Sequence, residues 1–110
     1  MEEAIITAKG VGGQMILYSN RVEIKRSGAL GFISQGMDWT KIIFVKSITG
    51  LQYKECGKVT SGYLQIIFQG SQESKNGLFD ATKDENTVIF AKAEEEEKFA
   101  QIRDYIISKI

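Results

Sequence analysis

The chain has 110 residues, and its 14 aspartates and glutamates balance its 14 lysines and arginines, so the formal net charge is zero. This length suits one domain with its own core, and the balanced charge excludes the broad positive field that draws proteins to nucleic acids. With no histidine and a single cysteine, Cys56, the chain lacks the residues for histidine-based catalysis, histidine metal ligation, a thiolate zinc site or an internal disulfide.

Short apolar segments separated by turn residues run through most of the chain. There are 11 glycines and no proline, so glycine marks most of the turns. Residues 2–9 favour one short element, which the glycines at positions 10, 12 and 13 bring to an end. About seven strands and one helix are predicted beyond them. The strands span about residues 14–18, 21–26, 40–46, 48–55, 63–69, 77–81 and 87–91, and the helix spans about residues 94–109.

The clearest hairpin joins the predicted strands 14–18 and 21–26 through a tight turn at Ser19-Asn20. Its second strand alternates, with Val22 and Ile24 on one face and charged side chains on the other. Such alternation is typical of a strand that buries one face and exposes the other to water.

Residues 27–40 combine three glycines with large apolar side chains. Clustered apolar residues on a surface usually meet a partner, and aromatic residues dominate binding hot spots. Large aromatic side chains are also mostly buried in folded proteins, which favours the alternative that this segment folds back onto the core. If the segment is exposed, the residues expected to contact another protein are Phe32, Ile33, Met37 and Trp39.

The predicted helix has one apolar face. Phe99, Ile102, Ile106 and Ile110 recur at steps of three and four residues, so they lie on one side of a helix. Glutamates 94–97 lie near its positive N-terminal end, and Lys109 lies near its negative C-terminal end. We expect the apolar face to cover the strands that precede it.

About seven antiparallel strands closed by one amphipathic helix resemble the small bacterial members of the pleckstrin homology (PH)-like family. Local sequence agrees over most of the chain, and the most specific match is Asp84-Glu85-Asn86-Thr87-Val88 ahead of the last strand and the helix. The other matching segments are Gly13-Gln14, Lys41-Ile42-Ile43, Ser47 to Leu51 and Gly62 to Phe68.

This resemblance implies a half-open barrel of two nearly orthogonal sheets whose end is plugged by the helix, with Phe99, Ile102 and Ile106 as the plug. It also implies a binding or assembly module, in some relatives oligomeric and in some joined to a short helical tail domain. Such a tail is not found in this sequence, so we expect a stand-alone protein or an excised domain.

Many PH domains bind inositol phosphates through basic residues of the first hairpin. Arg21, Lys25 and Arg26 lie in the corresponding region of this sequence and would be the lipid-binding residues. The tight Ser19-Asn20 turn departs from the longer basic loop of phosphate-binding members, and charged residues on one face of a strand also suit simple exposure to water. Weak attraction to an anionic membrane, worth about 1 kcal/mol per basic residue near the surface, is the alternative function.

The preferred interpretation is a non-catalytic module that contacts a protein partner or a second copy of itself, because an open barrel leaves strand edges to which another strand can pair. We expect no cofactor, metal or nucleic acid. No apolar run approaches the roughly 20 residues of a membrane span, and the Met1-Glu2-Glu3 start lacks the basic segment of a secretory signal. A cytoplasmic protein without a transmembrane segment is therefore predicted.

Overall fold

A computed structural model describes residues 3–11, 13–26, 39–68 and 86–110, with Arg26 and Trp39 described by their backbone. Two antiparallel sheets and a C-terminal helix make up this part of the chain, which confirms the predicted mainly β fold with one terminal helix. The elements are β1 (Ile6–Lys9), β2 (Gly13–Leu17), β3 (Arg21–Arg26), β4 (Trp39–Phe44), the 3₁₀ turn η3 (Val45–Ser47), β5 (Ile48–Lys54), β6 (Gly62–Phe68), β7 (Thr87–Phe90) and α2 (Ala93–Lys109).

The predicted elements agree with these bounds to within two residues at most ends. The strand predicted over 77–81 lies outside the described residues. The short element expected within residues 2–9 is the strand β1, so the chain begins its sheet one strand earlier than predicted. The strand predicted over 40–46 ends at Phe44, because Val45 turns into η3 and donates its backbone N–H to the Asn20 carbonyl oxygen at 2.9 Å. This turn carries the chain from the first sheet to the second.

The first sheet has the order β1-β2-β3-β4. Register places Val22 of β3 between Leu17 and Ile43, and all three side chains are buried. The next core position pairs Ile24 with Met15, which are both fully buried. The alternation predicted for β3 is therefore correct, and the face opposite the core is the outer face of the sheet.

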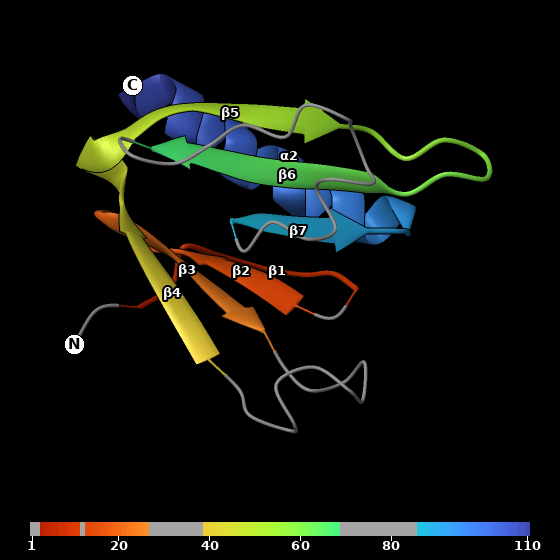
Figure 1. Cartoon of the computed structure of the whole chain (residues 1–110), viewed down its shortest axis with the longest axis horizontal. Coiled ribbons are helices and arrows are strands. Elements are labelled where there is room, and N and C mark those ends of the chain that lie inside the picture. The colour runs from red at the N-terminus through yellow and green to blue at the C-terminus, as the bar shows by residue number, and fades with distance from the viewer. Residues whose placement is uncertain (1–2, 12, 27–38, 69–85) are drawn as a thin grey trace.

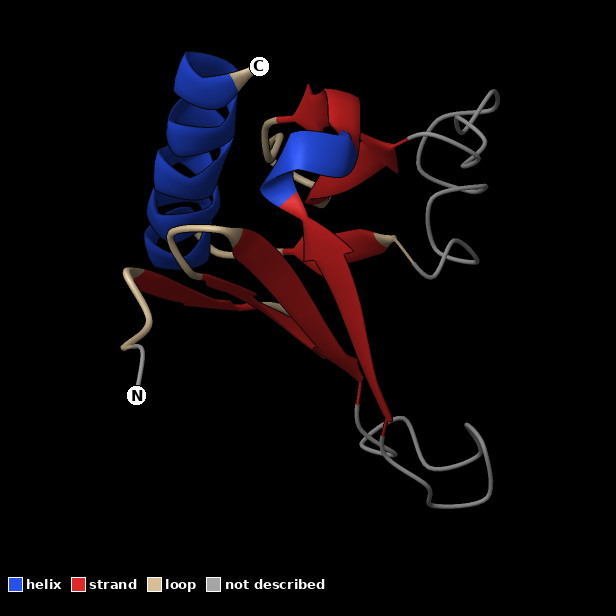
Figure 2. Ribbon diagram, turned by 90° about the vertical axis from the view of Figure 1, so that its left-hand side faces the viewer, coloured by secondary structure: helices blue, strands red, loops and turns tan. Residues whose placement is uncertain are grey.

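The second sheet has the order β5-β6-β7, and its middle strand is buried along most of its length. The isolated bridge between Val11 and Ile89 connects this sheet to the β1–β2 hairpin, with a hydrogen bond of 2.7 Å from the Val11 N–H to the Ile89 carbonyl oxygen. The described strands do not close into a barrel. The sheets instead diverge from the corner where β4 passes into β5 (Figures 1 and 2).

Helix α2 stands against one side of this arrangement, in contact with β1, η3, β5 and β6 (Figure 2). Its residues Phe99, Ile102 and Ile106 are fully buried, and the Phe99 ring stacks on Phe90 of β7 with centroids 4.8 Å apart. Ile110 was predicted on the same face, but it is 54% exposed because it lies beyond the last turn of the helix. The buried face of α2 completes the core that both sheets share.

Candidate binding surface

Three of the four residues predicted to contact a protein partner, Phe32, Ile33 and Met37, lie outside the described residues. Trp39 is the first residue of β4, and its backbone pairs with Arg26 of β3. The contact function of these four residues therefore stays a prediction.

The residues predicted to bind lipid all lie on β3, and the structure describes the side chains of two of them, Arg21 and Lys25. Arg21 is held by its neighbours: Nε is 2.9 Å from the Glu23 Oε2, Nη1 donates to the Asn20 Oδ1 at 3.0 Å, and the guanidinium lies 4.0 Å from the centroid of the Tyr18 ring. Lys25 is exposed on the same outer face, and Arg26 is described by its backbone. The charge of Arg21 is thus largely compensated before any ligand arrives.

The β2–β3 hairpin that carries these residues is preceded by another strand of the same sheet. Because β1 precedes it, the β2–β3 hairpin is the second hairpin of the sheet and not the first. The first hairpin joins β1 to β2, and the described residues between these two strands are Gly10 and Val11. Arg21, Lys25 and Arg26 therefore lie on the second hairpin of this sheet, and their lipid-binding role stays a prediction.

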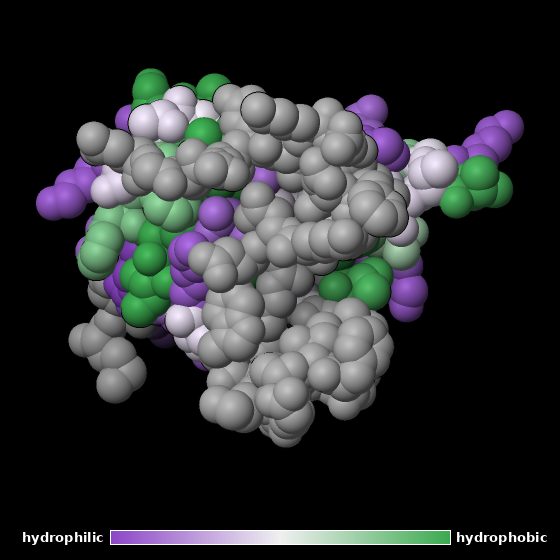
Figure 3. Space-filling model, in the orientation of Figure 1, coloured by the Kyte–Doolittle hydropathy of each residue, from purple (hydrophilic) through white to green (hydrophobic). Residues whose placement is uncertain are grey.

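The outer face of β4 carries two large apolar side chains. Ile42 is 51% exposed and Phe44 is 48% exposed, whereas Ile43 between them is buried. In register they lie beside Glu23 and Arg21, so an ion pair separates them from the rest of the sheet. Figure 3 shows hydrophobic surface over β4 on the left of the view. Among the described residues β4 pairs only with β3, which leaves its other edge without a strand partner there.

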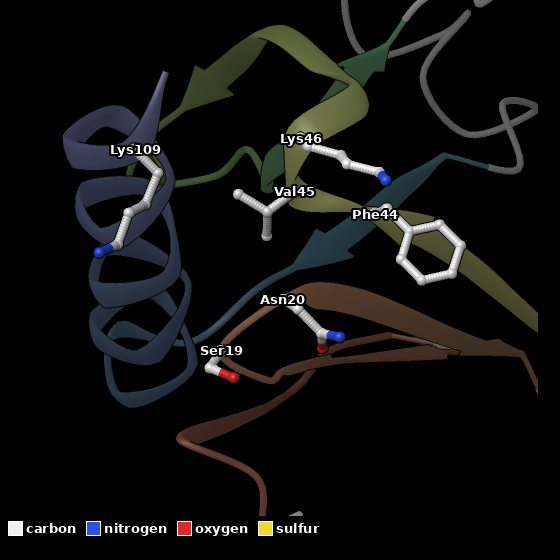
Figure 4. Close-up of a pocket in the computed structure, with 6 residues that line it drawn as sticks. All are labelled: Ser19, Asn20, Phe44, Val45, Lys46 and Lys109. Atoms are coloured by element: carbon white, nitrogen blue, oxygen red, sulfur yellow. The ribbon is translucent and has the colours of Figure 1, made fainter.

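A groove of about 450 Å³ lies at the corner between the sheets, and we call it the corner groove (Figure 4). It is formed where the β2–β3 turn, the β4–β5 junction and the end of α2 meet. Its lining residues are Ser19, Asn20, Phe44, Val45, Lys46 and Lys109. None of these residues is acidic.

Cys56 does not have the surroundings of a reactive thiol. Its Sγ lies 3.5 Å from the Phe90 carbonyl oxygen, and Glu96 accepts a hydrogen bond from its backbone N–H at 3.0 Å. Burial, followed by the nearby Glu96 carboxylate, raises the pKa of this thiol, although Lys54 and a backbone hydrogen bond from Gly62 act in the opposite direction. A thiol with a raised pKa is a poor nucleophile at neutral pH.

The described part of the chain contains no group of three cysteine, aspartate or glutamate side chains arranged to hold a metal ion. Its α-helix does not combine the length and the apolar character that a membrane-spanning helix needs. Comparisons of the sequence and structure with protein-family models, with curated proteins and with solved structures found no match. The surface itself therefore has to support any functional proposal.

The residues that define the outer face of β4 and the corner groove did not stand out in the sequence. The apolar run 42–45 indicates a strand, but its period alone does not say that Ile42 and Phe44 face away from the core. Lys46 and Lys109 are far apart along the chain. Only the packing of the helix end against the corner between the sheets brings Lys46 and Lys109 to the same groove.

Proposed function

We propose that this protein is a non-catalytic PH-like module that binds protein through the exposed edge and outer face of β4. The PH-like assignment is supported by the element order, with a four-stranded sheet, a three-stranded sheet and then the helix. The binding role is supported chiefly by one observation, which is that Ile42 and Phe44 are half exposed on an edge strand. An edge strand presents unpaired backbone groups, and apolar side chains beside it add contact area.

A second copy of the chain suits this edge. If β4 pairs antiparallel with β4 of another copy about Ile42, then Ile42 faces Ile42 and Thr40 faces Phe44. Lys41 then faces Ile43 on the opposite side of the sheet, so no like charges meet. A symmetric contact of this kind closes on itself and produces a dimer with one continuous sheet. Self-association is therefore the form of protein contact that we favour.

The substitution Ile42→Lys tests this proposal. Two lysines directly opposite each other at the symmetry axis repel, and lysine on an edge strand opposes pairing. We expect the dimer dissociation constant to rise by about tenfold or more, measured by light scattering over a range of concentrations. Val59→Lys is the matched control, because Val59 is 96% exposed on the β5–β6 turn, which projects away from β4 (Figures 1 and 3).

Two results would count against self-association through β4. One is a wild-type protein that stays a monodisperse monomer at high concentration. The other is an oligomer that Ile42→Lys and Val59→Lys affect equally, because that would place the contact elsewhere.

Binding to anionic membranes is the weaker proposal. Arg21 is engaged by Glu23, Asn20 and Tyr18, which leaves Lys25 as the exposed cation of the predicted set whose side chain is described. One lysine adds only about 1 kcal/mol of attraction to an anionic surface. Vesicle binding that disappears when Arg21 and Lys25 are reversed in charge would restore this proposal. The cytoplasmic location stays a prediction from the sequence.

A further inference from the structure

The corner groove is built before any ligand is present. The Asn20 carbonyl oxygen accepts a hydrogen bond from the Val45 N–H at 2.9 Å, which ties the β2–β3 turn to η3. The Ser19 carbonyl oxygen accepts a hydrogen bond from the Tyr105 hydroxyl at 3.1 Å, which ties the same turn to α2. The three walls of the groove are thus fixed to one another. Binding a ligand would therefore cost little conformational entropy in the protein.

The polar groups around the groove favour an anion. The Asn20 Oδ1 accepts from the Arg21 Nη1, so the amide nitrogen of Asn20 is left to donate toward the groove (Figure 4). Lys46 is exposed and, among the described residues, has no carboxylate partner. Lys109 lies on the opposite wall, where its ammonium lies 5.4 Å from the centroid of the Tyr105 ring. None of the described lining residues is acidic, so no described side chain of the lining repels an incoming carboxylate.

The C-terminal end of α2 repels an anion, and this repulsion helps to predict where in the groove an anion binds. The last backbone carbonyls of α2 carry partial negative charge, and Lys109 offsets part of it. An anion is therefore favoured on the side of Lys46 and Asn20, away from the helix axis. The exposed chain of Lys109 adds a second, longer-range attraction.

Apolar surface lies beside these donors. Phe44 presents a ring that is 48% exposed, and Val45 is buried next to it at the base of the groove. The ligand that suits the site therefore carries an acidic group and an apolar group close together. A free inorganic anion would leave the Phe44 ring unused.

We propose that the corner groove binds an acidic peptide segment, in which a carboxylate meets Lys46 and Asn20 while a neighbouring apolar side chain packs on Phe44 and Val45. This site goes beyond the proposed self-association and shares only Phe44 with the outer face of β4. A peptide suits the groove better than a membrane does, because the groove is concave and Lys46 and Lys109 lie on different elements with their ammonium groups pointing away from each other (Figure 4). A flat anionic surface is bound instead by clusters of several basic residues.

The test is a titration of the isotopically labelled protein, followed by NMR, with the acetylated and amidated peptide Gly-Glu-Leu-Glu-Gly. The neutral counterpart is Gly-Gln-Leu-Gln-Gly. We expect the glutamate peptide to shift the amide signals of residues 19–20, 44–46 and 109, and the glutamine peptide to do so much more weakly. The double substitution Lys46→Glu with Lys109→Glu should weaken binding of the glutamate peptide by about tenfold or more.

Lys58→Glu is the control, because it makes at one exposed residue of the β5–β6 turn the charge reversal that the double variant makes at two groove residues. It should leave the affinity close to that of the wild type. A charge exchange completes the design: the double variant should bind the corresponding lysine peptide better than the wild type does. The difference between the two peptides, the loss in the double variant, the unchanged affinity of Lys58→Glu and the charge exchange would together support the acidic-peptide site.

Several results would overturn it. These are an absence of shifts at the groove, equal binding of the glutamate and glutamine peptides, and an equal loss of affinity in the Lys58→Glu variant. Binding to vesicles containing phosphatidylserine without binding to the glutamate peptide would assign the groove to a lipid headgroup instead. Failure here is distinguishable from failure of self-association, because Ile42→Lys changes the oligomeric state without changing any residue that lines the groove.

Discussion

Gly10 stands where the β1–β2 hairpin touches the second sheet. A Cβ atom at this position would overlap the carbonyl oxygen of Ile89 and press on the Val88 side chain. The neighbouring residue Val11 makes the only bridge between the sheets among the described residues. Glycine is required here because the two backbones approach closely, and the missing Cβ lets the hairpin lie against β7.

The substitution Gly10→Ala should therefore destabilise the fold. Overpacking of a tight contact costs about 1–3 kcal/mol in free energy of unfolding, measured by chemical denaturation. Gly50→Ala is the control, since a Cβ at Gly50 would meet nothing within 4 Å. That variant should be neutral or more stable by up to about 1 kcal/mol, because alanine loses less backbone entropy than glycine does. Equal stabilities of the two variants would show that the Gly10 contact is unimportant.

Helix α2 depends on tertiary packing at the scale of one element. Glu95 stabilises its N-terminal end by accepting hydrogen bonds from the backbone N–H groups of Ala91 and Lys92, at 2.9 Å and 3.2 Å. Local capping of this kind is worth about 1 kcal/mol. The larger contribution is the burial of Phe99, Ile102 and Ile106 against both sheets.

Substitutions at two adjacent isoleucines of α2 distinguish the effect of packing from that of helix propensity. Ile106 is fully buried and Ile107 is 54% exposed. We expect Ile106→Ala to lower the free energy of unfolding by about 2–5 kcal/mol through loss of burial and a cavity, and Ile107→Ala to change it by about 0.5 kcal/mol or less. Thermal or chemical unfolding measures both. If Ile106→Ala is as stable as the wild type, the helix does not pack on the sheets as described.

At the scale of the whole molecule, the two proposed binding surfaces lie next to each other and differ in the interactions that they offer a partner. The outer face of β4 offers backbone hydrogen bonds and the apolar side chains of Ile42 and Phe44. The corner groove adds charge through Lys46 and Lys109. Salt screens exposed charges over about 8–10 Å at moderate ionic strength but has little effect on apolar burial or strand pairing.

Salt should therefore separate the two surfaces. The molar mass measured by light scattering is expected to stay the same between low and high salt, because β4 pairing does not rely on ion pairs. Affinity for the glutamate peptide should fall over the same range, because both lysines are exposed. An oligomer that dissociates at high salt would contradict the β4 contact and indicate an electrostatic interface.

Local pattern was enough for the elements whose two faces differ in polarity. The alternation of Val22 and Ile24 with charged residues predicted the buried face of β3 correctly, and the helical period predicted Phe99, Ile102 and Ile106 as the buried face of α2. In both cases the signal lies within a few residues of the chain, because each side chain's direction follows from the period of the element. Ile110 broke the pattern only because the helix ends before it.

The arrangement of those elements needed the tertiary structure. Residues 6–9 carry too short a pattern to be assigned as a strand, and pairing with β2 decides that they are one. Pairing likewise turned Ile42 and Phe44 outward on an edge strand, although the apolar run 42–45 has no polar face. The corner groove joins residues from positions 19 to 109. The sequence by itself thus determined most of the described elements and their buried faces. Only the folded chain decided which side chains meet at a surface, because such contacts link residues that no local period connects.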